Sequence, residues 1–280
     1  MKKLLAALSI ASTFLFSCQK EIGTEVVSGG GTTGGTSGTK LLRIGTRLGT
    51  DSVTTNYSYD GTGRLTAYTQ DGTINGQLAD IQINLVRNPS GIITSTVIKS
   101  SLFAGLGFDE VLTDYIYDAA ASRYKYAKTT VTAFGDTYTD SVVYTYDAMG
   151  NLASAVDWED DGTGYVPYTK EEYTYAGSNL ASLKSFTFND FTSSYDLDAA
   201  SSFEYDTKIS PLKQTRNDAV VLGVSLFHSA NNQVKADIVT TDPPTTSVKN
   251  VVYTYNNSNL PTKGVSTTGS LVSTNSYYYQ

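Results

Sequence analysis

The sequence Tyr144-Thr145-Tyr146-Asp147-Ala148-Met149-Gly150-Asn151-Leu152 has a pattern that returns along most of the chain. A close copy runs from Tyr57 to Leu65, with Asp60 and Gly63 at the matching places. With weaker copies included, the first aromatic residue recurs at positions 57, 115, 144, 173, 203 and 253, in steps of 58, 29, 29, 30 and 50 residues. A repeat of this kind fixes the architecture before any other feature is interpreted. The chain is therefore predicted to be built from units of about 29 residues.

Within each unit the side chains alternate with a period of two. Val142, Tyr144 and Tyr146 fall on one face of an extended strand, and Val143 and Thr145 fall on the other. Such alternation is typical of antiparallel strands with one packed face and one wetter face. Tyrosine and β-branched residues also favour strands by type.

The second half of the repeated phrase predicts a turn. An Asp at the first turn position can accept hydrogen bonds from backbone N–H groups two residues on. Gly150 follows three residues after Asp147, where a positive φ is wanted in a type I turn with a bulge. Leu152 then begins the return strand. The phrase is thus predicted to form a hairpin.

Degenerate copies are predicted near Ile81–Ile83 and Asn231–Val234, and Tyr277–Tyr279 resembles a terminal half-unit. Six or seven copies give about 14 strands, and an open sheet of that width rarely stays flat. The predicted fold is all-β: antiparallel β-hairpin repeats forming a long twisted or wrapped meander sheet, with at most one short helix. The segment 217–232 lacks alternation and is compatible with that helix or with a buried strand.

The N-terminus has the features of a secretion signal. Lys2 and Lys3 precede an apolar run that ends at Leu15-Phe16-Ser17-Cys18, and the run is too short to span a membrane. Leu15–Cys18 resembles a bacterial lipobox, so Cys18 is expected to become a lipidated first residue after removal of signal peptide 1–17. The alternative is an ordinary signal peptide with a buried free thiol. Because Gln19 follows, the expected location is an outer-membrane lipoprotein, on the periplasmic face or at the cell surface.

Residues 18–40 are expected to form the lipid anchor and a flexible Gly/Thr/Ser tether, and residues 41–280 the β domain. The tether has too few apolar residues to offset the entropy of ordering it. The formal net charge of −7 makes nucleic acid a poor partner, because nucleic acid binding needs a basic surface. The lipid is therefore expected to hold the protein at the membrane.

The repeated phrase resembles the YD repeat of Rhs-type proteins, whose core is Tyr-Asp, then Gly, then Arg or Asn, then Leu. Tyr59-Asp60 with Gly63-Arg64-Leu65 matches that core in full, as does Tyr146-Asp147 with Gly150-Asn151-Leu152. The resemblance covers most of residues 52–280 and implies an envelope lipoprotein of unknown function. Large Rhs proteins enclose a C-terminal toxin. This chain has few copies and ends on a predicted strand, so that role is not carried over.

Aromatic residues near an acidic turn are the candidate ligand-binding site. Trp158, Tyr165 and Tyr168 flank Asp157–Gly162, and aromatic faces next to polar groups suit the stacking of sugars. The alternative is that Trp158 shares a face with Leu152 and Val156 and packs in the core.

The same acidic turn partly matches a calcium-binding loop, with Asp157, Glu159 and Asp161 as weak metal candidates. The twelfth position is Tyr168 instead of Glu, which favours a solvated hairpin turn. No cofactor is expected. The single histidine, His228, has no partner identifiable in the sequence, and the chain lacks a Gly-x-Ser-x-Gly elbow, so no catalytic residue is assigned.

These features favour a lipid-anchored, cell-envelope β-repeat protein that binds a glycan or an envelope protein and has no enzymatic activity. The alternative is an envelope polysaccharide hydrolase that uses a close Asp/Glu pair, one member of which has a raised pKa.

Overall fold

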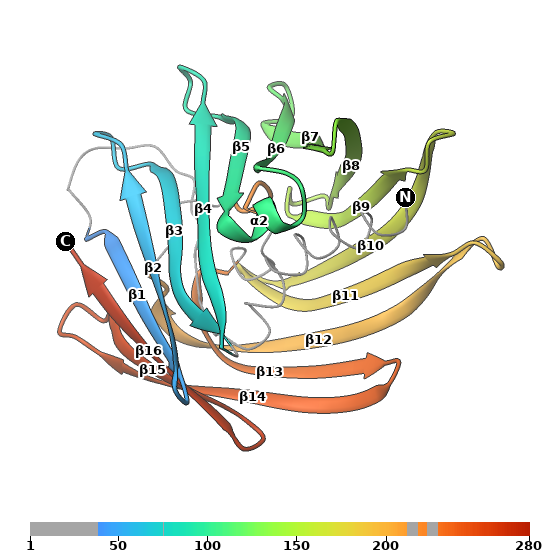
Figure 1. The fold of residues 1–280 in the computed structure, drawn as a ribbon. Helices are drawn as coiled ribbons and strands as arrows, with labels where there is room; N and C mark the ends of the chain where they lie inside the picture. Colours follow the sequence, from blue (N-terminus) through green and yellow to red (C-terminus); the bar gives the residue numbers. More distant parts are fainter. Residues whose placement is uncertain (1–38, 75, 212–217, 223–228) are drawn as a thin grey trace.

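The chain forms a closed antiparallel β-barrel (Figure 1). A computed structural model describes residues 39–74, 76–211, 218–222 and 229–280. Sixteen strands follow one another around the barrel in chain order, and β1 pairs with β16 to close it. The strands are β1 (Leu41–Leu48), β2 (Asp51–Tyr59), β3 (Leu65–Ile74), β4 (Gln77–Arg87), β5 (Ile93–Ser100), β6 (Glu110–Asp118), β7 (Arg123–Ala133), β8 (Asp136–Tyr146), β9 (Leu152–Asp160), β10 (Tyr165–Ala176), β11 (Asn179–Asn189), β12 (Ser194–Ile209), β13 (Asn231–Thr241), β14 (Pro244–Tyr255), β15 (Pro261–Thr268) and β16 (Leu271–Tyr279).

The predicted all-β class and the order of antiparallel hairpins are confirmed. The expected long twisted or wrapped meander sheet is a closed barrel, a choice that the sequence left open, and the described residues form sixteen strands instead of about 14. One short helix is present among the described residues, α2 (Ser101–Gly105), which the Ser100 side chain caps. The sequence left segment 217–232 as either a helix or a buried strand. Residues 218–222 form turns and Asn231 begins β13, while residues 217 and 223–228 lie outside the described residues. No helix among the described residues is long and apolar enough to cross a membrane.

The repeated Asp organises each turn through both carboxylate oxygens. Asp147 Oδ1 accepts the N–H groups of Met149 (2.9 Å) and Asn151 (2.8 Å), and its Oδ2 accepts the Asn151 side-chain amide (2.9 Å). The Asn151 amide and these N–H groups lower the pKa of Asp147. Asp60 makes the same contacts with Thr62 and Arg64. Arg or Asn follows Gly in the phrase because its side chain returns to the Asp.

The strands that follow the repeated turns carry a β-bulge within their first few residues. In the β8–β9 pair, Thr145 faces Ser154 and Tyr146 faces Leu152, which leaves Ala153 as the extra residue. The extra residues near the starts of strands are Leu42, Thr66, Thr94, Lys125, Ala153, Ala181, Val234 and Thr262, and further irregularities lie between Pro167 and Lys170 on β10 and at Asp198 on β12. Where that residue is threonine, its hydroxyl bonds a facing carbonyl, as in Thr66 Oγ1 to Ser58 O (3.1 Å). A bulge bends a strand and increases its twist, so one bulge per hairpin curls the sheet toward closure.

The bulges also decide which side chains enter the barrel. Alternation resumes one residue out of step after each bulge, so Leu152 is buried inside while Trp158, opposite Ser141, lies on the outer face. The prediction that Trp158 shares a face with Leu152 is therefore wrong.

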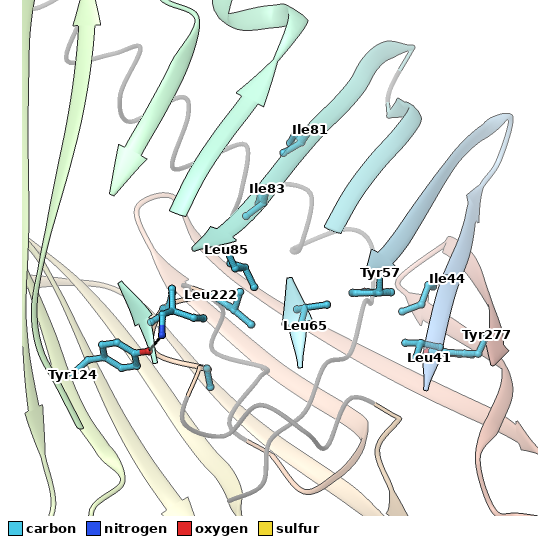
Figure 2. Packing of buried hydrophobic residues seen from close by; sticks show 13 residues of the cluster. Leu41, Ile44, Tyr57, Leu65, Ile81, Ile83, Leu85, Tyr124, Leu222 and Tyr277 are labelled. Carbon is cyan, nitrogen blue, oxygen red and sulfur yellow. Dashed lines mark hydrogen bonds between the residues drawn. The ribbon is translucent and has the colours of Figure 1, made fainter. Parts of the chain in front are cut away.

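The interior is packed with the repeated tyrosines and aliphatic side chains (Figure 2). Tyrosine hydroxyls satisfy main-chain carbonyls of the preceding hairpin: Tyr59 donates to Leu41 O (2.8 Å), Tyr146 to Tyr124 O (2.6 Å) and Tyr279 to Pro261 O (2.7 Å). The tyrosines thus combine a large apolar area with a satisfied polar end.

A segment between β12 and β13 enters this core. Ala219, Val221 and Leu222 are buried in the same cluster, and Figure 2 places Leu222 in it with Leu85 and Tyr124. Arg87 occupies the tyrosine position of a degenerate repeat. It donates to Leu65 O (2.9 Å) and pairs with Asp218 (2.8 Å). Arg87, which replaces the repeated tyrosine, therefore holds the segment around Asp218 in the core.

The outward positions of most strands are polar. On β2, Ser52, Thr54 and Asn56 point away from the core, and on β4 Asp80 and Gln82 do so.

Candidate functional site

Apolar side chains are exposed at several outward positions, among them Val86 on β4 and Val252 on β14, and in one part of the outer face they follow one another from strand to strand. Directly opposed outward residues on seven strands in succession, β6 to β12, form a continuous row. We call this row the outer belt: Ile116, Tyr126, Val143, Val156, Lys170, Phe186 and Leu197. Ile116 is 55% exposed, and Val143 and Leu197 are each 38% exposed. A contiguous apolar surface of this kind marks an interaction site more often than scattered apolar residues do.

A second row of rings lies beside the belt at its β9–β12 end. Trp158 is directly opposite Pro167, and Phe188 is directly opposite Tyr195 with ring centroids 5.2 Å apart. Lys170 Nζ lies 5.5 Å from the Phe186 ring centroid and 5.6 Å from that of Tyr195. The lysine also pairs with Glu172, so its charge is compensated within the surface. Trp158, Pro167, Phe186, Phe188 and Tyr195 together make a ring-rich platform.

The inner face of the same strands carries carboxylates. We call Asp140, Asp157, Glu159 and Glu171 the inner acidic wall. Asp140 on β8 is directly opposite Glu159 on β9, and Asp157 lies one inward position further along β9. On β10, Glu171 is opposite Ala155, the next inward residue of β9. The four carboxylates therefore lie on adjoining inward positions of three neighbouring strands.

Burial and mutual repulsion perturb the acidity of this wall. Burial, with the charges of Asp157 and Glu159, raises the pKa of Asp140 to about 7. Burial and the charge of Glu159 raise the pKa of Asp157 to about 6. Burial also raises the pKa of Glu171, against a hydrogen bond that Glu171 accepts from Tyr173. Near neutral pH the wall can therefore hold a proton on one carboxyl beside an ionised neighbour.

The structure separates the aromatic residues predicted from the sequence. Trp158 and Tyr165 lie on the outer face, where the Tyr165 hydroxyl bonds Thr139 Oγ1 (2.8 Å). Tyr168 lies within the irregularity of β10, between Pro167 and Lys170. Burial and the charges of Glu159 and Asp157 raise the pKa of Tyr168. Only two of the three predicted aromatics therefore share a surface.

The predicted metal candidates also diverge. Asp157 and Glu159 point inward, whereas Asp161 closes the β9–β10 turn by accepting the Thr163 N–H (2.8 Å) and Gly164 N–H (3.1 Å). Among residues 39–74, 76–211, 218–222 and 229–280, no group of three or more His, Cys, Asp and Glu side chains is arranged to hold a metal ion. His228 and Cys18 lie outside the described residues.

Sequence reasoning missed Pro167, Phe186, Phe188 and Tyr195 of the platform and Asp140 and Glu171 of the wall. Asp140 could have been identified from the sequence, because it alternates with Val142 and Tyr144 on the predicted packed face. Phe186 and Phe188 alternate as well, but the bulge at Ala181 determines the face on which they emerge.

No family model matches the chain, and no curated protein matches it. Among solved structures, it is similar to a porin-like protein from Bacteroides uniformis ATCC 8492, with a TM-score of 0.51 and 16% identity over 86% of this chain and 96% of that one. A porin-like protein from Bacteroides vulgatus ATCC 8482 gives a TM-score of 0.52 and 9% identity over 86% and 99%. At these identities the similarity shows a shared barrel fold.

Proposed function

We propose that the chain is a lipid-tethered β-barrel of the bacterial cell envelope that binds a glycan on its outer face and catalyses no reaction. The observation that carries the proposal is the ring-rich platform beside the outer belt. Flat rings in an otherwise polar surface suit the apolar faces of sugars, and their charged neighbours are already paired.

The envelope location rests on the sequence features of Cys18 and the tether. The polar outward strands support a barrel that stands off the bilayer while its lipid provides the attachment, in the outer membrane on the periplasmic side or at the cell surface. The turn chemistry of Asp60 and Asp147 supports our assignment of the repeat to the YD type.

A glycan array probed with the full chain tests the function. We expect binding to a defined set of glycans that Trp158→Ala or Tyr195→Ala weakens. Tyr278→Ala is the matched control, since Tyr278 is an outward tyrosine on β16 that is 45% exposed. Absence of binding to every glycan would end the proposal.

A second candidate function is polysaccharide hydrolysis on the inner acidic wall. It is favoured by Asp140 lying directly opposite Glu159, while burial and the neighbouring carboxylates raise the pKa of Asp140 to about 7. Glycosidases use two carboxyl groups, one of which is protonated as the general acid. Release of reducing ends that Asp140→Asn and Glu159→Gln both abolish would support hydrolysis. Intact polysaccharide after prolonged incubation with the wild-type chain would exclude it.

A further inference from the structure

The outer belt is long and narrow. Neighbouring strands are about 4.8 Å apart, so the six steps from Ile116 to Leu197 span about 29 Å. Successive outward residues along a strand are about 7 Å apart, so the belt and its second row are about 10–14 Å wide. The resulting surface covers about 300–400 Å² and runs across the strands.

This size argues against a globular partner. A stable protein–protein interface buries about 800 Å² on each side, roughly twice the area of the belt. A second copy of the chain or a folded partner would therefore have to cover the polar strands on either side. An extended polymer, in contrast, needs only a narrow track.

The charges around the belt favour an uncharged polymer. Lys170, the one cation in the row, is engaged by Glu172 and by the rings of Phe186 and Tyr195. The whole chain has a formal net charge of −7, which repels acidic polymers over long distances. The remaining members of the row are uncharged side chains that offer contact area and few hydrogen bonds.

We infer that the outer belt binds one extended, uncharged polysaccharide laid across strands β6 to β12, with successive sugars seated on the Trp158–Phe186 platform and on Tyr126. This inference rests on the proposed glycan binding and adds the length, charge and direction of the ligand. The platform is one end of the track, and Tyr126 and Ile116 on β7 and β6 are the other.

Affinity electrophoresis of the full chain in gels that contain neutral glucan, mannan, galactan or xylan tests the inference, with polygalacturonate as the acidic probe. We expect retardation by a neutral polymer and much weaker competition by its disaccharide. Phe186→Ala and Tyr126→Ala should each weaken polymer binding by about three- to tenfold, as expected for the loss of one ring contact. Ile116→Thr, which keeps strand propensity, is a second variant at the far end, and Tyr278→Ala is the control.

The outcomes separate the two levels of the proposal. Binding that the disaccharide competes fully, and that Tyr126→Ala and Ile116→Thr leave unchanged, would overturn the extended track while glycan binding stands. Preference for polygalacturonate would overturn the uncharged ligand. Retardation by no polymer, together with a dimer in sedimentation that Phe186→Ala dissociates, would replace the glycan by a second copy and overturn both.

Discussion

Replacing Asp140 by Asn should stabilise the protein at alkaline pH. The folded barrel raises the pKa of Asp140 from 3.8 to about 7. A shift of about 3 units corresponds to about 4 kcal/mol, since each unit is worth about 1.4 kcal/mol. Part of the cost of ionising Asp140 in the folded protein is repulsion shared with Asp157 and Glu159. Asp140→Asn should therefore raise the free energy of unfolding by on the order of 2–4 kcal/mol.

The sign follows from the raised pKa. The folded state holds the proton more tightly than the unfolded state, so the free energy of unfolding falls as pH rises from about 4 to about 7. The cost is absent below that window and fully present above it. Asp140→Asn should therefore raise the urea midpoint at about pH 8 and change it little at about pH 4.

Urea unfolding followed by circular dichroism at both pH values measures this difference. Asp114→Asn is the matched control, because Asp114 is an exposed carboxylate on the outer face of β6. A variant that is no more stable than wild type at about pH 8, or equally stabilised at both pH values, would refute the electrostatic account of the wall.

Three further substitutions test the architecture, each by urea unfolding. Asp147→Ala should lower the urea midpoint because three donors in the turn lose their acceptor. Asp147→Asn should leave the midpoint unchanged, because in the last copy of the repeat Asn256 accepts the N–H groups of Ser258 and Leu260. Equal effects of the two substitutions would contradict the role of Asp147 in the turn. Arg87→Met should lower the free energy of unfolding by about 3–5 kcal/mol, because it leaves buried Asp218 unpaired. Adding Asp218→Asn should recover much of that loss. A double variant whose loss is the sum of the two single losses would argue against the ion pair. Gly72→Ala should lower the urea midpoint strongly, because Gly72 has a φ of +146° and a Cβ there would lie 2.0 Å from Ser52 O. Gly61→Ala is the control and should leave the midpoint unchanged, because a Cβ at Gly61 would have open space around it.

The strands and turns could be predicted from the sequence because each hairpin contains the residues that determine its own packed face and turn. Tyrosine alternation gave the packed face, and Asp with Gly gave the turn. Closure was not readable, since it depends on a single extra residue per hairpin, such as Thr66 or Ala153, that has no distinctive identity. The same bulges moved Trp158 to the outer face.

The candidate site was predictable only in part. Trp158 and Tyr165 were selected for their type, and both lie on the outer face. Phe186 and Tyr195 join Trp158 through strand register, which connects residues that no local pattern links. The belt is a property of seven strands in succession, so it could not be recognised before their pairing was known.

Fluorescence of Trp158 reports both the outward orientation of the platform and its occupation by a ligand, because the chain contains one tryptophan. An outer-face Trp158 should be quenched by acrylamide in the free protein. A neutral polysaccharide that occupies the belt should protect it in a saturable way, with weaker protection in Phe186→Ala and full protection in Tyr278→Ala. A tryptophan that acrylamide cannot reach in the free protein, or polysaccharide binding that leaves quenching unchanged, would contradict the outward platform and its role in binding.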